Sequence, residues 1–248
     1  MNAVYVMWIR QLKRYSRSRA RIIGSLGQPL LFLLGLGFGF GSIYQRAGQG
    51  DYIQFLAPGV IAMTILFSSV FSGIELIWDR QFGFLKETLV APVPRLMIMI
   101  GRTLGGATVA VLQGLIVVII CLLAGFRVRS VSALPMMLVY MVLTAILFTA
   151  FGTAVASLLS DFQGFQLVMN FLIMPMFFLS GALFPLTNVP KVLEIIATVN
   201  PLSYGVDGLR LALIGIAHFG ASVDLTVLTA LVALMLVVGS YLFSRIQL

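Results

Sequence analysis

The sequence contains few of the residues from which catalytic and metal sites are usually built. One cysteine, one histidine and eight acidic residues occur among 248. A chain with one cysteine and one histidine cannot form a histidine- or thiolate-rich metal cluster or a disulfide framework of its own. The phosphate-binding pattern GxxxxGK[ST] and the zinc-protease pattern HExxH do not occur either. We therefore expect a chain that is not an enzyme and holds no cofactor.

Charged residues are scarce, and long uncharged segments take their place. They make up 10% of the chain against 60% hydrophobic residues, with a mean hydropathy of +1.07, whereas soluble domains carry roughly 25% charged residues. Six runs of 20 to 31 residues lack any charge: 22–45, 52–74, 103–126, 130–160, 162–190 and 225–244. About 20 apolar helical residues cross a hydrocarbon core of about 30 Å.

The sequence therefore predicts an all-α polytopic membrane protein forming a single domain over residues 1–248. The six predicted spans cover about 22–44, 53–76, 103–125, 133–159, 164–185 and 223–244. The runs place no carboxylate at midspan, where a proton-driven carrier would need one. Energy for any transport is therefore expected to come from elsewhere.

The basic residues cluster before the first predicted span. Six precede it without an acidic residue among them: Arg10, Lys13, Arg14, Arg17, Arg19 and Arg21. This positive-inside pattern predicts a cytoplasmic N-terminus, and six crossings return the C-terminus to the same side. The net charge of +8 is thereby explained by the membrane, without a nucleic-acid partner.

Residues 2–19 predict an amphipathic helix lying in the cytoplasmic interface. At about 100° per residue, Val4, Trp8 and Tyr15 gather on one side while Arg10 and Arg14 lie on the other. A basic face opposite a Trp- and Tyr-bearing face is typical of interfacial helices. The alternative is a basic tail that only orients the chain.

Two segments between spans are unusual. The loop 79–102 is charged and contains a short helical candidate, 82–90, which ends before Pro92 and Pro94. Its apolar edge could enter a soluble partner, and the alternative is an ordinary solvated loop. Residues 186–216 predict a re-entrant helical hairpin on the outer side, broken at Asn200-Pro201.

The charged pair of that hairpin is Asp207 and Arg210. Their spacing of three residues places them on one helix face, where they are expected to pair. A structural ion pair and direct contact with substrate are both compatible with the spacing. Four glycines of the first span, Gly35, Gly37, Gly39 and Gly41, form small-xxx-small pairs and predict close helix packing without naming a partner.

Three stretches together resemble a known family. They are LAPGVIAMTILFSSVFSG (56–73), DRQFGFLKETLVAPVPRLMIMIGR (79–102) and NPLSYGVDGLR (200–210). In this order, with six spans and a basic N-terminal helix, the chain resembles ABC-2 type transporter permeases of the branch that contains daunorubicin-resistance and nodulation-factor export permeases. It departs from the pattern at Phe84, where many members carry Thr or Ser.

The resemblance implies a partner for the loop and a role for the hairpin. A separate ATP-binding-cassette subunit, which would carry ATP and Mg²⁺, would receive a coupling helix formed by Gly83, Leu85, Lys86, Glu87, Thr88 and Leu89. Asn200, Pro201, Asp207 and Arg210 would shape the outer hairpin or gate. The permease would pair with a second copy of itself or a paralogue in the prokaryotic inner (plasma) membrane.

The expected function is export of an amphipathic, lipid-like, glycan or drug substrate. Two alternatives are an ATP-independent channel or carrier and a membrane-embedded enzyme that modifies lipids. A charge-lined pore or midspan carboxylates would indicate the former, and clustered Asp, His and Arg at the interface the latter. The sequence shows only scattered charges.

Overall fold

The computed structural model of the chain describes residues 3–46, 51–85, 93–159, 161–187 and 189–246. Within these ranges the regular structure is helical and contains no strand, which confirms the all-α prediction. The first helices are α1 (Ala3–Arg17), α2 (Arg19–Phe32), the π-helical η1 (Leu33–Phe38), α3 (Gly39–Arg46), α4 (Tyr52–Phe71), α5 (Ile74–Gln81) and α7 (Arg95–Leu123).

The second part of the chain continues the bundle with both long and short helices. These are η2 (Val131–Ala133), α8 (Leu134–Leu158), α9 (Phe162–Val168), the π-helical η3 (Met169–Ile173), α10 (Met174–Phe178), α11 (Lys191–Val199), α12 (Pro201–Ile214) and α13 (Ala221–Ser244).

Five helical stretches are long and apolar enough to cross a membrane: Ile22–Gly41, Tyr52–Gln81, Arg95–Leu123, Val131–Leu158 and Ala221–Ser244. The fifth predicted span, 164–185, corresponds to the shorter apolar helix formed by α9, η3 and α10. At about 1.5 Å per residue this helix reaches roughly 25 Å, less than the hydrocarbon core. The polytopic membrane architecture is confirmed, with five stretches long enough to cross and one shorter apolar helix.

Two helix limits differ from the prediction for the same reason. The second span continues through α5 to Gln81, and the third begins at Arg95, directly after Pro94. The ends of the predicted spans were placed at the ends of the uncharged runs. The helices extend past them because Asp79 and Arg102 form a buried ion pair, which removes the cost of leaving either charge unpartnered.

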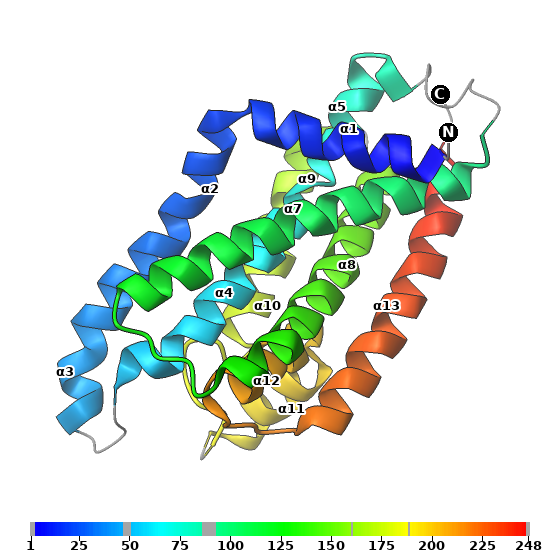
Figure 1. Cartoon of the computed structure of the whole chain (residues 1–248). Helices are drawn as coiled ribbons and strands as arrows, with labels where there is room; N and C mark the ends of the chain where they lie inside the picture. Colours follow the sequence, from blue (N-terminus) through cyan, green and yellow to red (C-terminus); the bar gives the residue numbers. More distant parts are fainter. Residues whose placement is uncertain (1–2, 47–50, 86–92, 160, 188, 247–248) are drawn as a thin grey trace.

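The helices form one bundle whose ends differ (Figure 1). Helix α1 lies across the end that carries both chain termini, here called the terminal end, while α11 and α12 lie at the opposite end. Arg95 at the start of α7 donates hydrogen bonds to the carbonyls of Ser244 and Ile246. These bonds tie the C-terminal end of α13 to the terminal end.

Helix α4 is the centre of the core. Residues 56–66 are almost wholly buried because α4 packs against α7, α8 and α12. Two glycines make this possible: a Cβ on Gly59 would lie 2.3 Å from the Ala182 carbonyl oxygen, and one on Gly73 would lie 2.4 Å from that of Gly152. Backbone contacts this close are typical of membrane bundles.

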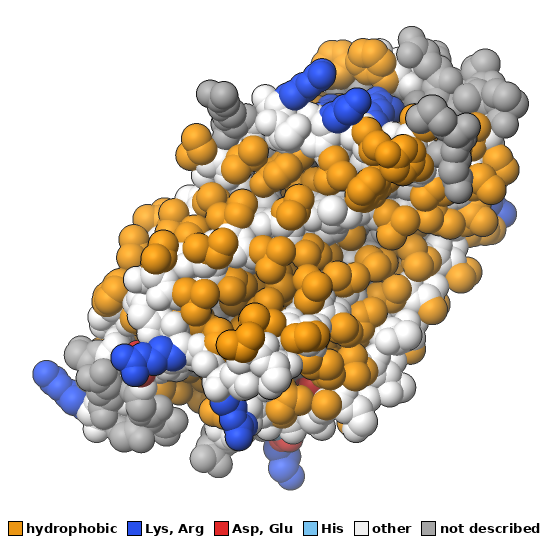
Figure 2. Space-filling view, viewed as in Figure 1, with side chains coloured by type: hydrophobic (Ala, Val, Ile, Leu, Met, Phe, Trp, Pro, Cys, Tyr) orange, Lys and Arg blue, Asp and Glu red, His pale blue; other side chains and the backbone are white. Residues whose placement is uncertain are grey.

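The outer surface is apolar between its two ends. Hydrophobic side chains cover the middle of the face in Figure 2, and Lys and Arg side chains lie towards its two ends. On α13, Leu234, Val237 and Tyr241 are 51%, 69% and 53% exposed. A soluble protein rarely exposes such a continuous apolar surface, so this belt fits contact with lipid tails or another apolar surface.

Candidate functional site

A buried carboxylate joins three helices at the terminal end. Asp79 of α5 is 3% exposed. Its Oδ2 accepts a hydrogen bond from Nη1 of Arg102 on α7 at 2.7 Å, and its Oδ1 accepts from Arg10 and Arg14 of α1 at 3.3 and 3.4 Å. We call Asp79, Glu75, Arg10, Arg14 and Arg102 the Asp79 network.

The strength of this network is concentrated in one pair. The side chains of Asp79 and Arg102 are 4% and 5% exposed, so each would be a costly buried charge without the other. The side chains of Arg10 and Arg14 are 38% and 33% exposed, and solvent weakens their pairs. Arg14 also lies 3.7 Å from Glu75, one turn earlier on α5, and so bridges two carboxylates.

Helix α1 rests directly on α7. The predicted helix 2–19 forms as α1, but its buried residues are Met7, Gln11 and Tyr15, whereas Tyr5 is 49% exposed. The close contact has two causes in α7. A Cβ on Gly101 would lie 2.7 Å from the Met7 Cβ, and one on Gly105 would lie 2.6 Å from the Gln11 Cβ.

The predicted coupling residues are only partly described. Gly83 follows α5 with φ of +80°, a left-handed conformation that favours glycine and turns the chain away from the helix axis. Leu85 is fully buried, while Phe82 and Phe84 beside it are 71% and 52% exposed. Lys86, Glu87, Thr88 and Leu89 lie outside the described residues, so their role stays a prediction.

A basic groove runs between α1 and this turn. It encloses about 860 Å³ and is lined by Tyr5, Val6, Ile9, Arg10, Lys13, Arg14, Arg17, Asp79 and Phe84. Its single carboxylate, Asp79, is already paired with Arg102. The groove therefore combines excess positive charge with exposed apolar side chains, and an acidic, partly apolar surface would fit it.

At the opposite end, Asn200 joins α11 to α12. Its Oδ1 accepts a hydrogen bond from the Leu202 N–H at 3.0 Å, and its Nδ2 donates to the Met176 carbonyl at 2.6 Å. Asn200 is thus the N-cap of α12, with Pro201 at the first helical position. The second bond fixes the helix pair to the end of α10.

Asp207 and Arg210 do not pair with each other as the sequence predicted. Asp207 accepts hydrogen bonds from the backbone N–H groups of His218, Phe219 and Gly220, at 2.8 to 3.4 Å, just before α13. Arg210 donates to the Gly181 carbonyl at 2.9 Å and lies 4.1 Å from the centre of the Phe55 ring. No ion pair joins these two described side chains.

Each charge of the hairpin therefore has its own role. Both residues are buried, at 3% and 5% exposure. Burial lowers the pKa of Arg210 to about 10, with the nearby Asp207 opposing the shift, so the guanidinium stays charged at neutral pH. Charge-assisted bonds of this kind are strong. Asp207 fastens α12 to α13, and Arg210 fastens it to the segment after α10.

Sequence reasoning missed the Asp79 network as a site. It named Asp79 and Arg102 only as charges of the loop, because 23 residues separate the pair and no spacing rule relates them. It also missed Gly101 and Gly105, although their small-xxx-small spacing is the same signal that was noticed in the first span.

Known proteins match this chain over most of its length. The family model described as "ABC-2 type transporter" matches residues 2–214. Nodulation protein J of Rhizobium leguminosarum bv. viciae is 28% identical over 244 residues, which are 96% of this chain and 93% of that protein.

Two further relatives are named as permeases. The inner membrane transport permease YadH of Escherichia coli (strain K12) is 27% identical over 217 residues, covering 86% of this chain and 84% of that protein. The putative transport permease ycf38 of Cyanophora paradoxa is 29% identical over 214 residues, covering 84% and 72%. The resemblance seen in the sequence is confirmed: the chain belongs to the ABC-2 type transporter family.

Proposed function

We propose that the chain is the membrane-spanning permease subunit of an ABC exporter. ATP would be hydrolysed, with Mg²⁺, by a separate ATP-binding-cassette subunit, which agrees with the lack of a phosphate-binding loop in this sequence. The permease would act with a second copy of itself or a paralogue in a prokaryotic inner (plasma) membrane. The terminal end of the bundle would face the cytoplasm, as the basic N-terminal segment predicts.

The observation that carries this proposal is the position of the Asp79 network. Helix α5 continues α4, the core helix, and leads directly into the turn at Gly83. A partner that moved this turn would therefore move α5. Asp79 would pass the displacement to α1 through Arg10 and Arg14 and to α7 through Arg102. A bundle with two stable arrangements could then switch the exposure of its pathway.

The basic groove supports docking of the ATPase at this place. Phe84 contributes an exposed apolar side chain to it, and Lys13 and Arg17 contribute positive charge. A buried aromatic side chain surrounded by complementary charge is a common anchor of protein interfaces. Lys86, Glu87, Thr88 and Leu89 would complete the coupling helix that enters the ATPase.

The opposite end would face outwards and act as the exit side. There Asn200, Pro201, Asp207 and Arg210 would hold the short helices α11 and α12 in one position against α10 and α13. The transported compound would be amphipathic, such as a lipid, a lipid-linked glycan or a drug. It would leave the cytoplasm or the inner leaflet.

ATP turnover of a reconstituted complex tests the proposal. The chain is co-expressed with a candidate ABC ATPase subunit and placed in lipid nanodiscs, with Phe84→Ala as the variant. Loss of an aromatic anchor costs about 2 kcal/mol or more, so we expect roughly 30-fold weaker association and lower ATP turnover. Phe171→Ala is the matched control, because Phe171 is 79% exposed on η3 and outside the groove.

Two results would contradict the proposal. One is unchanged co-purification and turnover with Phe84→Ala. The other is nucleotide hydrolysis by the purified chain alone.

A further inference from the structure

A cavity of about 540 Å³ lies between the junction of α1 and α2 and the helices α4, α5 and α7. Its volume falls in the range of about 300–1,000 Å³ that is usual for small-molecule sites. We propose that this cavity binds the head group of the transported amphiphile, and that this head group is uncharged and rich in hydroxyls. The inference rests on the proposed function and names the substrate class and its site.

The charges of the cavity cancel. Its ionisable lining residues are Arg14 and Glu75, whose side chains lie 3.7 Å apart. Arg14 also donates to Asp79 at 3.4 Å, so its positive charge is already shared between two carboxylates. A phosphate or an ammonium group would find no uncompensated opposite charge here. The lining therefore disfavours charged head groups of either sign.

The other polar lining groups are neutral, and three of them offer acceptors. Gln113 of α7 is 2% exposed, and its Oε1 has no hydrogen-bond partner among the described residues. The hydroxyls of Ser25 and Thr64 donate to carbonyls of their own helices, at 2.9 Å each, which leaves their oxygens as acceptors. A head group with several hydroxyls supplies donors to all three and can also accept from the Gln28 amide.

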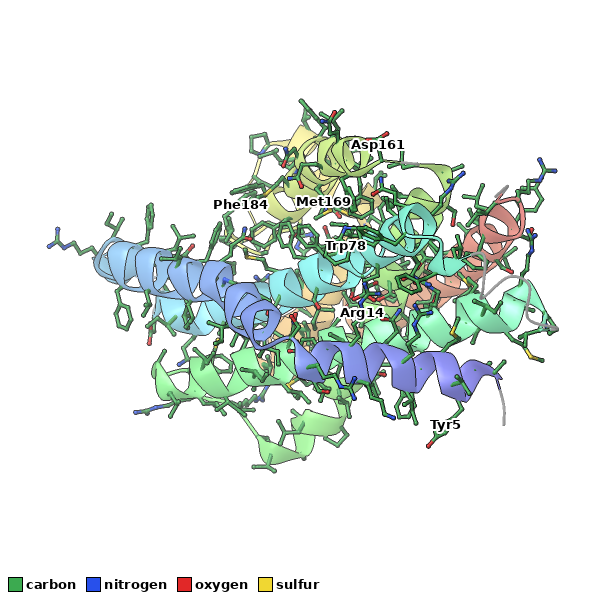
Figure 3. The ribbon with its side chains drawn as sticks, turned by 90° about the horizontal axis from the view of Figure 1, so that it is seen from above. Tyr5, Arg14, Trp78, Asp161, Met169 and Phe184 are labelled. Carbon is green, nitrogen blue, oxygen red and sulfur yellow. The ribbon has the colours of Figure 1, made fainter. Side chains whose placement is uncertain are left out.

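Aromatic side chains supply part of the apolar wall. Trp78 is 43% exposed and offers a flat apolar ring to the C–H face of a sugar. In Figure 3, Trp78 lies between Arg14 and Met169 of η3, and the Arg14 guanidinium is 5.7 Å from the ring centre. The cavity wall therefore has both the hydrogen-bonding and the stacking surfaces that bind carbohydrates.

A row of rings leads away from the cavity. Phe71 and Phe67 both line it and lie 6.4 Å apart, and Phe67 is 6.3 Å from Phe177 of α10. The row runs along α4 away from the terminal end, and an apolar chain attached to the head group would lie against it. Arg14 lines both this cavity and the basic groove, and so connects the head-group site with the Asp79 network.

Direct binding to the full-length chain tests this inference. The chain has two tryptophans, and Trp8 lies outside the cavity, so Trp8→Phe leaves Trp78 as the only fluorescent tryptophan. The protein is placed in phosphatidylcholine nanodiscs and titrated with dodecyl maltoside below its micelle concentration. Dodecyl phosphate and dodecyltrimethylammonium provide the same chain with charged head groups. Protein carrying Trp78→Phe, with Trp8 retained, reports unspecific insertion into the disc.

We expect saturable binding of the maltoside and at least about tenfold weaker binding of both charged analogues. In the Trp8→Phe background, Gln113→Leu should weaken maltoside binding about three- to tenfold, the effect of one lost hydrogen bond. Gln166→Leu is the matched control, because Gln166 is an exposed glutamine of α9 outside the cavity. If Gln113→Leu does not fold, Ser68→Phe, which fills the cavity from α4, should abolish the signal.

The inference is overturned if a charged analogue binds as tightly as the maltoside. It is also overturned if neither cavity variant changes binding, or if no saturable signal is seen. The titration needs no ATPase, so its failure leaves the coupling proposal standing. Conversely, failure of the ATP-turnover test would not remove a measured head-group site.

Discussion

Removing the charge of Asp79 should destabilise the bundle more than removing any one of its partners. In Asp79→Asn, the Arg102 guanidinium stays buried at 5% exposure and loses its carboxylate at 2.7 Å. Breaking a buried ion pair from one side costs about 3–5 kcal/mol. Arg10 would lose its carboxylate as well, and Arg14 would keep its pair with Glu75 at 3.7 Å.

The partners should rank in a definite order. Arg102→Gln removes one strong charge-assisted bond but leaves Asp79 paired with Arg10 and Arg14, so we expect a loss of about 1.5–3 kcal/mol. Arg10→Gln removes a partly exposed pair and should cost only about 0.2–1 kcal/mol. The double variant Asp79→Asn/Arg102→Gln removes both charges of the buried pair and should be more stable than Asp79→Asn alone.

Equilibrium unfolding in mixed micelles, followed by circular dichroism, measures this series. Additive losses in the double variant would show that Asp79 and Arg102 do not interact. A loss for Asp79→Asn no larger than that for Arg10→Gln would show that the carboxylate is not the centre of the network. Either result would refute the assignment of Asp79 as the junction of α1, α5 and α7.

Three further outcomes follow from single contacts. Gly105→Val should push α1 off α7, because its Cβ would lie 2.6 Å from the Gln11 Cβ, and should lower the free energy of unfolding by about 1–3 kcal/mol. Trypsin should then cleave α1 faster. Gly27→Val is the control, because Gly27 has open space around it and its substitution should not change cleavage. Asp207→Ala should lower the free energy of unfolding by about 1–3 kcal/mol, because it leaves backbone N–H groups before α13 unpaired. Unchanged thermal stability would contradict the role of these hydrogen bonds. Asn200→Ala should lower the free energy of unfolding by about 1 kcal/mol, because the N-cap of α12 is lost. Unchanged protection of the α12 amides from hydrogen exchange would contradict this role of Asn200.

The fold was largely predictable because uncharged runs report directly on membrane burial. Their ends were less informative, since α5 and α7 continue through Asp79 and Arg102, whose charges are balanced by tertiary pairing. The length of an uncharged run in the sequence cannot show this pairing. The same limit explains the glycines of the first span: Gly37 packs against Ile53, but Gly39 has no neighbouring atom within 4 Å of its ideal Cβ position.

The pair of short helices α11 and α12 was predictable from the sequence, whereas its contacts and the Asp79 network were not. Helix spacing put Asp207 and Arg210 on one face, but their partners come from distant segments, at 218–220 and Gly181. Backbone groups of remote segments leave no signal in side-chain spacing. Gly83 was placed within the helical candidate 82–90, but it lies in a turn after α5 with φ of +80°.

The central claim is that the segment after α5 faces the cytoplasm while the pair α11 and α12 faces outwards. The chain has one cysteine, the buried Cys121, so Cys121→Ala provides a cysteine-free background. Phe82, 71% exposed, and Lys191, exposed at the start of α11, are replaced by cysteine one at a time. A membrane-impermeant maleimide should label Lys191→Cys in intact cells and Phe82→Cys only in inverted vesicles. Labelling of Phe82→Cys from outside intact cells would contradict the account.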